Sequence, residues 1–265
     1  MFLNAMTARQ TLPHRCHGDG PQRVVAIHGW FGDQHTFDAL LPFVDGSTFT
    51  VVLPDLRGYG EAIEFPGEFT IDEAAHDVLD LAEQLGWLTF SLVGHSMGGK
   101  IAQRVIALAP DKVDRMVGIS PVPASGVPFD PDTAALFQRA VTEPEARRQI
   151  IDGSTGSRYG SPWLDKMVWY STTHSREAAF AAYLTSWSGD DFHAEVAGAE
   201  TPVKIIVGAQ DPSLSAEVMR QTLMQWFPRS ELTVFADAGH YAIDEVPIAT
   251  ASEIETFLLR QRHVS

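Results

Sequence analysis

The sequence contains a single cysteine among its 265 residues, so no disulfide can form within the chain. Disulfides persist in oxidising compartments, whereas the cytosol keeps thiols reduced. We therefore expect a reducing, cytoplasmic location. The cysteine, Cys16, lies in an expected early strand, and we predict that its thiol is buried and unreactive.

Basic residues are scarce relative to acidic ones. Lys and Arg together number 19 against 34 Asp and Glu, which gives a formal net charge of −15. Proteins that bind nucleic acids or anionic membranes through their surface present clustered positive charge, so neither partner is expected. The acidic balance says little about a small-molecule substrate, because surface charge keeps a protein soluble whatever its pocket binds.

Long apolar runs and cofactor motifs are also missing. No apolar run approaches the roughly 18 residues of a transmembrane helix. The N-terminal segment MFLNAMTARQ lacks the basic region and apolar core of a secretory signal peptide, so none is expected. The sequence holds no HExxH motif, cysteine cluster or dinucleotide-binding fingerprint, and we expect neither a metal nor an organic cofactor.

What the chain does contain is a regular alternation of short apolar runs with amphipathic segments. Continuous apolar runs are typical of strands that are buried on both faces. Their alternation with helices predicts an α/β fold with a doubly wound, mostly parallel sheet. The expected strands are 24–27, 49–53, 90–93, 116–119, 203–207 and 232–235, and the expected helices are 36–41, 70–85, 96–109, 216–226 and 247–259.

This alternation stops between residues 121 and 201. We interpret residues 121–201 as a helical cap inserted into a core formed by residues 1–120 and 202–265. Aromatic residues are frequent in the cap, and they either pack its helices together or line an apolar pocket. The helical segments expected in the cap are about 131–142, 143–152, 162–171 and 175–186.

The sequence GHSMGG at residues 94–99 joins an expected strand directly to an expected helix. A strand that turns into a helix through G-x-S-x-G holds its serine in a tight elbow, with glycines where a Cβ would collide with the neighbouring backbone. Ser96 then stands at a helix N-terminus, where free N–H groups and the helix dipole favour negative charge. This environment suits a nucleophile whose reaction builds an oxyanion.

Asp211 and His240 provide the partners that a nucleophilic serine needs, namely a general base and a group that orients this base. Asp211 follows the run 203–207, and His240 follows the run 232–235. With Ser96, all three residues leave the carboxyl ends of parallel strands, where open α/β sheets place their sites. We therefore predict a catalytic triad of Ser96, His240 and Asp211, in the chain order Ser, Asp, His.

Two other acidic residues, Asp237 and Asp244, lie near His240 in the sequence. Residues so close along a loop rarely adopt the geometry that orients an imidazole ring. Some serine hydrolases carry the acid after the strand that follows the elbow helix, but residues 120–124 read SPVPA and offer no carboxylate. Asp211 therefore remains the expected acid.

An oxyanion requires two N–H donors aimed at the developing charge. We expect these donors to be the backbone N–H of Met97 and, from the loop after the first long strand, the backbone N–H of Trp30. His28 in this loop and His95 in the elbow are expected to have structural roles. The side chains expected to contact the substrate are Trp30, Phe31, Trp163, Trp187 and Tyr241.

From about Leu12 to Leu259, the chain resembles the α/β-hydrolase superfamily. The matching motifs are HGW at 28–30, DLRGYG at 55–60, GHSMGG at 94–99, GAQDP at 208–212 and AGHY at 238–241. The second motif departs from the usual pattern, because Tyr59 stands where histidine is frequent and Glu61 follows where serine is common. We expect this departure to alter the pocket wall and not the triad.

The resemblance implies a serine hydrolase that cleaves a carboxylic ester or a lactone of a mainly apolar small molecule through an acyl-enzyme. A serine in the elbow disfavours the relatives that use an aspartate nucleophile, the haloalkane dehalogenases and epoxide hydrolases. Three alternatives remain open: a hydrolase of C–C bonds, a cofactor-free oxygenase or perhydrolase, and a non-catalytic receptor for a small ligand. The pattern does not reveal the oligomeric state.

Overall fold

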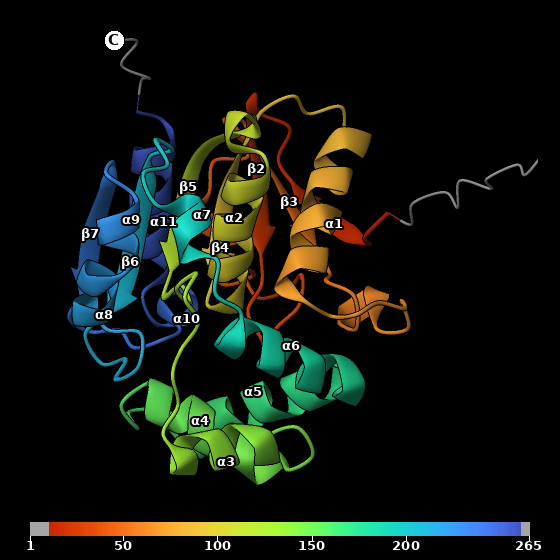
Figure 1. The fold of residues 1–265 in the computed structure, drawn as a ribbon, viewed down its shortest axis with the longest axis vertical. Helices are drawn as coiled ribbons and strands as arrows, with labels where there is room; N and C mark the ends of the chain where they lie inside the picture. The colour runs from red at the N-terminus through yellow and green to blue at the C-terminus, as the bar shows by residue number, and fades with distance from the viewer. Residues whose placement is uncertain (1–10, 261–265) are drawn as a thin grey trace, which may run out of the picture.

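The computed structural model describes residues 11–260, which form a layered α/β structure (Figure 1). The segment 1–10, for which no signal peptide was expected, lies outside the described residues. Within 11–260 the chain forms a seven-stranded sheet with the order β1-β3-β2-β4-β5-β6-β7. The strands are β1 (His14–His17), β2 (Gln22–Ile27), β3 (Phe49–Pro54), β4 (Phe90–His95), β5 (Val113–Ile119), β6 (Val203–Gly208) and β7 (Ser230–Phe235).

β1 pairs with β3 in the antiparallel direction, and every other neighbouring pair of strands is parallel. Helices pack against both faces of the sheet (Figure 1). The predicted α/β fold with a doubly wound, mostly parallel sheet is therefore confirmed. Because parallel strands end at the same edge, the loops after β2, β4, β6 and β7 meet at one end of the sheet.

The apolar runs form central strands because both of their faces are covered. In β2, Val25 and Ile27 join the core cluster formed with α1 (Ile71–Gln84) and α2 (Met97–Leu108). Val24 and Ala26 point to the opposite face and pack in the cluster that contains α11 (Pro247–Leu258). Successive side chains of a strand alternate between faces, so a stretch of strand that is covered on both sides is apolar at successive positions.

The predicted capping residues of α1 are present. The Thr70 side chain accepts a hydrogen bond from the Glu73 N–H at 3.1 Å, as the sequence predicted. The Glu73 carboxylate reaches back to the N–H of Phe69 at 2.8 Å rather than to that of Thr70. Gly86 follows the helix with a φ of 70°, a conformation that glycine adopts without strain.

Two helix predictions differ from the structure. Residues 36–41 form successive turns that lead into a 3₁₀ helix at Leu41–Phe43, because the Asp33 carboxylate accepts the His35 N–H and stabilises a turn. The helix expected at 216–226 is broken at Thr222, whose φ of −123° and ψ of −98° are not helical. It therefore forms two short helices, α8 (Ala216–Gln221) and α9 (Leu223–Trp226).

Cys16 lies in a strand, as predicted, but its predicted burial is wrong. β1 is at the edge of the sheet and pairs only with β3, so its side chains are exposed or half-buried. The Cys16 thiol is exposed and lies 3.6 Å from the Gly18 carbonyl oxygen. Partial burial and then the charge of Asp19 raise the pKa of the thiol. Because the thiolate is the reactive form, the raised pKa lowers the reactivity of Cys16 although its side chain is not fully buried.

The chain between β5 and β6, residues 121–201, is called here the helical segment. It contains helices, as predicted, and most of them gather at the carboxyl ends of the strands (Figure 1). Its last short helix returns to pack beside α2. The helices are α3 (Pro131–Arg139), α4 (Pro144–Ser154), α5 (Ser161–Thr173), α6 (Glu177–Gly189) and α7 (His193–Val196).

A substitution at Gly98 tests whether the elbow tolerates a side chain. A Cβ there would lie 2.2 Å from the Ile27 carbonyl oxygen and 2.6 Å from that of His28, and neither backbone atom can move easily. We expect Gly98→Ala to lower the free energy of unfolding by roughly 3 kcal/mol or more in urea denaturation. As a control, Gly153→Ala should be neutral or stabilising by up to about 1 kcal/mol, since a Cβ there meets no atom within 4 Å. Equal effects of the two substitutions would contradict this account of the elbow.

Candidate active site

Ser96 lies between β4 and α2 with a φ of 54° and a ψ of −117°. A positive φ is strained for a residue with a side chain and must be stabilised by its surroundings. Main-chain hydrogen bonds provide this support: the Ser96 N–H donates to the Ile119 carbonyl, and the Ser96 carbonyl accepts from the N–H groups of Gly99 and Val122, at 2.9 to 3.0 Å. The elbow is therefore held by the neighbouring strand and by the chain that follows it.

Asp211 and His240, from the loops after β6 and β7, form a direct hydrogen bond. The His240 Nδ1 lies 2.7 Å from the Asp211 Oδ2. The other oxygen, Oδ1, accepts the N–H groups of Ser213 and Leu214 at 2.9 and 3.0 Å. With Nδ1 donating to the carboxylate, Nε2 is free to accept a proton, as a general base requires.

Asp211 is ionised although its side chain is only 1% exposed. Burial raises the pKa of the carboxyl group, but the neighbouring His240 and the two backbone N–H donors outweigh this effect, and the pKa is lowered overall. By contrast, burial raises the pKa of Asp244 to about 6. No hydrogen bond joins Asp237 or Asp244 to the His240 ring in the described residues, so Asp211 is the acid that the geometry selects.

Ser96 and His240 line the same two cavities. Within residues 11–260 the structure shows no hydrogen bond between the Ser96 hydroxyl and the His240 ring. Such contacts are often long before a substrate binds. The structure thus brings all three predicted triad residues to one place, with the Asp–His contact formed and the Ser–His contact open.

The two predicted oxyanion donors lie beside the serine. A Cβ on Gly29 would be 3.1 Å from the Ser96 Cβ, so the main chain of the loop 28–30 passes directly against the elbow. In the described part of the chain, neither the Trp30 N–H nor the Met97 N–H donates to a protein acceptor. Two unpaired N–H groups, of which that of Met97 is at the N-terminus of α2, are suited to an oxyanion.

The two cavities differ in character. The larger, of about 520 Å³, contains polar groups from α5 and from the turn after β2, including His35, Tyr170 and Lys166. The smaller, of about 250 Å³, is lined mainly by apolar side chains of the helical segment, such as Phe129 and Leu136. Leu214, from the loop after β6, also lines it. The residues common to both are Trp30, Phe31, Ser96, His240 and Tyr241.

The predicted substrate contacts fall into two groups. Trp30, Phe31 and Tyr241 line both cavities, and Trp187 lines the smaller one. Trp163 lines neither of them; its ring packs against that of Tyr241, with the centroids 5.5 Å apart. Trp163 therefore packs against Tyr241, and its position does not favour a direct contact between Trp163 and a substrate.

Trp30 also connects its loop to the helical segment. Its ring stacks on Phe180 of α6 with the centroids 3.9 Å apart, and its Nε1 donates to the Phe180 carbonyl at 2.9 Å. Such a stacked and hydrogen-bonded indole has little freedom to move. The side chain therefore holds in place the main chain that carries one of the candidate oxyanion donors.

His28 has the structural role expected for it. Its Nε2 accepts the Leu56 N–H at 3.1 Å, and its Nδ1 lies 2.8 Å from the Gly29 carbonyl. Burial lowers the pKa of His28, which keeps the ring neutral in this arrangement. Tyr59, the residue that departs from the usual motif, packs on His28 with the ring centroids 5.0 Å apart. Tyr59 lines neither cavity, so its expected effect on the pocket wall is not observed.

Two residues near His240 have roles that the sequence patterns did not indicate. The His95 Nε2 lies 3.0 Å from the His240 carbonyl, to which it donates. Glu245, four residues after Tyr241, accepts the N–H groups of Gly239 and Tyr241. The glutamate lies on the short helix α10 (Ala242–Glu245), which the sequence patterns did not predict. The AGHY motif ends at Tyr241 and does not include Glu245.

The described residues show no group of three or more His, Cys, Asp and Glu side chains able to hold a metal ion. None of the helices within 11–260 has both the length and the apolar character needed to cross a membrane.

The buried His95 ring should make stability depend on pH. Burial, and then the nearby His240, lower the pKa of His95 to about 3. The unfolded chain then binds a proton near pH 6.5 and the folded chain does not, so stability is full above pH 6.5 and falls as the pH drops towards 3. From pH 7.5 to pH 5, we expect the wild type to lose roughly 2 kcal/mol more than His95→Gln in urea unfolding. Parallel losses in the two proteins would show that His95 is not the group responsible.

Comparisons with known proteins agree with this fold. The sequence profile of the alpha/beta hydrolase fold matches residues 22–180. A serine hydrolase-like protein of Dictyostelium discoideum is 35% identical over 101 residues, which are 37% of this chain and 28% of that protein. The esterase YbfF of Escherichia coli is 25% identical over 267 residues, 91% of this chain and 94% of the esterase. An esterase from Exiguobacterium antarcticum has a similar structure, with a TM-score of 0.84 at 18% identity over 94% of this chain and 96% of that one.

Proposed function

Because the chain belongs to the α/β-hydrolase fold family, we propose that it is a serine hydrolase that cleaves carboxylic esters. One observation carries the proposal: the hydrogen-bonded Asp211–His240 pair and Ser96 meet where two cavities share lining residues. Similarity to an Escherichia coli esterase over most of both chains supports the same reaction class.

In the proposed reaction, the Ser96 Oγ attacks the ester carbonyl while the His240 Nε2 takes the hydroxyl proton. Asp211 stabilises the imidazolium that forms. The N–H groups of Trp30 and Met97 bind the oxyanion of the tetrahedral intermediate. His240 then donates the proton to the leaving alkoxide, and a water molecule, activated by His240 in its turn, releases the acid from Ser96.

The two cavities suggest how an ester would lie. We propose that residues 121–201 act as a cap and that an apolar acyl or alkyl group occupies the smaller cavity, which Phe129, Leu136 and Trp187 help to line. The other part of the ester would extend into the larger cavity, whose polar groups accept hydrogen-bonding substituents. A lactone, in which both parts are joined, would have to fit at the junction.

The composition supports the remaining features of this proposal. A net charge of −15 supports a small-molecule substrate rather than a nucleic acid or an anionic membrane. The single cysteine, exposed at the sheet edge, supports a reducing compartment such as the cytoplasm.

Replacing the nucleophile tests the reaction class. We expect Ser96→Ala to lower kcat/KM for p-nitrophenyl butyrate by about 10³-fold or more, because the acyl-enzyme can no longer form. His240→Gln should have a comparable effect, with the fold checked by circular dichroism.

The same variant separates the alternatives. Full turnover of a natural substrate by Ser96→Ala would exclude every mechanism with a serine nucleophile and would favour a histidine-base oxygenase. Ligand binding without turnover by the wild type would favour a receptor, and hydrolysis of a diketone in preference to any ester or lactone would favour C–C bond cleavage.

Filling the smaller cavity tests the orientation of the substrate. Leu136→Trp adds volume to the wall of this cavity, so we expect kcat/KM for p-nitrophenyl octanoate to fall about tenfold or more relative to the acetate. Leu88→Trp is the matched control, since Leu88 is 82% exposed and lines neither cavity. A loss that is the same for octanoate and acetate would show that the longer chain does not enter this cavity.

A further inference from the structure

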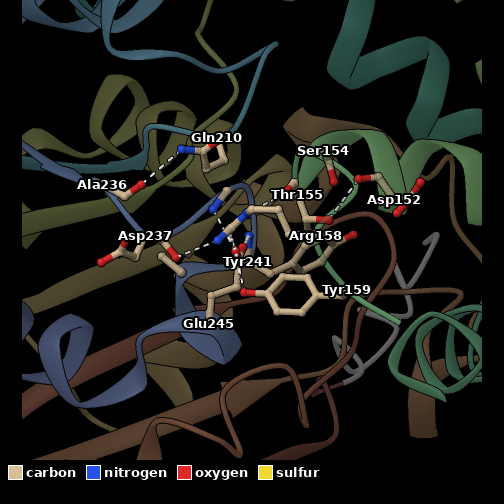
Figure 2. A network of polar contacts seen from close by, with 12 residues as sticks. Asp152, Ser154, Thr155, Arg158, Tyr159, Gln210, Ala236, Asp237, Tyr241 and Glu245 are labelled. Atoms are coloured by element: carbon tan, nitrogen blue, oxygen red, sulfur yellow. Dashed lines mark hydrogen bonds and ion pairs between the residues drawn. The ribbon is translucent and has the colours of Figure 1, made fainter. Parts of the chain in front are cut away.

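We infer that Glu245, clamped by Arg158 of the helical segment, is a positioning residue that fixes the main chain on both sides of His240 (Figure 2). The inference rests on the proposed function only in taking His240 as the general base. Glu245 touches neither Ser96 nor the Asp211 carboxylate, so it would act through the loop that carries His240.

The Glu245 carboxylate binds the residues before and after His240. Its Oε2 accepts the Gly239 N–H at 2.8 Å, and its Oε1 accepts the Tyr241 N–H at 2.9 Å. The side chain is only 1% exposed, so water does not compete for these bonds. A two-point contact of this kind fixes the direction in which the His240 side chain leaves the backbone.

The main chain of His240 itself is held from two further sides. Its N–H donates to the Ser154 carbonyl at the end of α4, at 3.0 Å, and its carbonyl accepts from the His95 Nε2. Gly239 is confined as well, because a Cβ there would lie 2.7 Å from both the Ser154 oxygen and the Thr155 Cα. The His240 loop is thus packed directly against the end of α4.

Arg158, in the turn after α4, supplies the charge that a buried carboxylate needs. Its guanidinium forms an ion pair with Glu245 and donates to the carbonyls of Thr155 and Asp237 at 2.8 and 3.1 Å. The Tyr159 hydroxyl donates to the same Glu245 oxygen at 3.0 Å. Figure 2 shows these groups converging on Glu245 from the helical segment. An isolated buried carboxylate would be costly, so the partner makes this position possible.

Substituting one or the other member of the Glu245–Arg158 pair changes the charge near His240 in opposite directions. Removing the charge of Glu245 leaves Arg158 near His240 and disfavours the imidazolium, whereas removing Arg158 leaves the carboxylate and favours the imidazolium. The other titratable or charged groups around His240 stay the same in both variants. They include Asp211 after β6, His95 at the end of β4 and Tyr241 next to the ring, and also Asp244, Lys166, Tyr170, His174 and His35, which line the larger cavity together with His240.

The test compares Glu245→Gln and Arg158→Met with the control Arg148→Met. Arg148 is a good match, because it lies on α4 and is 25% exposed against 31% for Arg158, and it pairs with Asp165 away from the His240 loop. Three measurements are made on each protein: the pH titration of the His240 ring by NMR with ¹⁵N-labelled histidine, the rate of reaction of Ser96 with a fluorophosphonate, and kcat and KM for p-nitrophenyl butyrate.

We expect Glu245→Gln to lower kcat and the fluorophosphonate rate about tenfold or more while KM changes little, because the base is misplaced and the cavities are intact. The midpoint of the His240 titration should move to lower pH by a few tenths of a unit in Glu245→Gln and to higher pH in Arg158→Met. Arg158→Lys should restore the wild-type midpoint, and Arg148→Met should behave as the wild type.

Wild-type rates in Glu245→Gln would overturn the inference, since a pair that only stabilises the fold would lower stability without lowering the rates. Midpoints that move in the same direction or not at all in the two variants would also overturn it, because the pair would then not act on His240. If Glu245→Gln does not fold, the midpoints of Arg158→Met and Arg158→Lys decide the question. If the wild type neither hydrolyses esters nor labels at Ser96, the proposed function fails, and the NMR titration still decides the inference.

Discussion

The close approach of three backbones at the elbow is the constraint on which the site depends. A Cβ on Gly98 would collide with the carbonyl oxygen of Ile27, at the end of β2, and a Cβ on Gly94 would lie 2.4 Å from the Gly98 oxygen. Only with glycine at both positions can α2 start this close to β2 and β4. This proximity brings Ser96, in its strained conformation, against the main chain of the loop 28–30, which carries one of the two proposed oxyanion donors.

The helical segment is connected to the core at the residues that the proposed reaction uses. Phe180 of α6 binds the indole of Trp30, and the fully buried Lys100 of the elbow helix donates to the Trp187 carbonyl at 3.0 Å. The end of α4 accepts the His240 N–H, and Arg158 pairs with Glu245. The same helices line the smaller cavity. A segment that shapes the pocket thus also supports the elements that carry the proposed nucleophile, oxyanion donor and base, so we expect changes in its packing to alter rate as well as specificity.

The sequence was sufficient for the features that follow from periodicity and from backbone geometry. The central strands contain continuous apolar runs, and the glycines around Ser96 and the order of Ser96, Asp211 and His240 predicted where the chain would converge. Features that depend on individual hydrogen bonds, on local dihedral angles or on a strand's place in the sheet could not be read in this way. The turns at 36–41 follow a side-chain cap, and the helix break at Thr222 follows a change in that residue's dihedral angles. Cys16 is exposed because its strand lies at the edge of the sheet. The proposed role of Glu245 depends on Arg158, 87 residues away, and no local pattern contains both.

The most direct test of the account is a crystal structure of the protein after reaction with a p-nitrophenyl alkylphosphonate. The phosphorus should be bonded to the Ser96 Oγ, with the phosphonyl oxygen at about 2.7–3.1 Å from the N–H groups of both Trp30 and Met97. The His240 Nε2 should lie within hydrogen-bond distance of the Ser96 Oγ, and the alkyl chain should occupy the cavity lined by Leu136. An adduct on another residue, or a phosphonyl oxygen directed away from both N–H groups, would contradict the account.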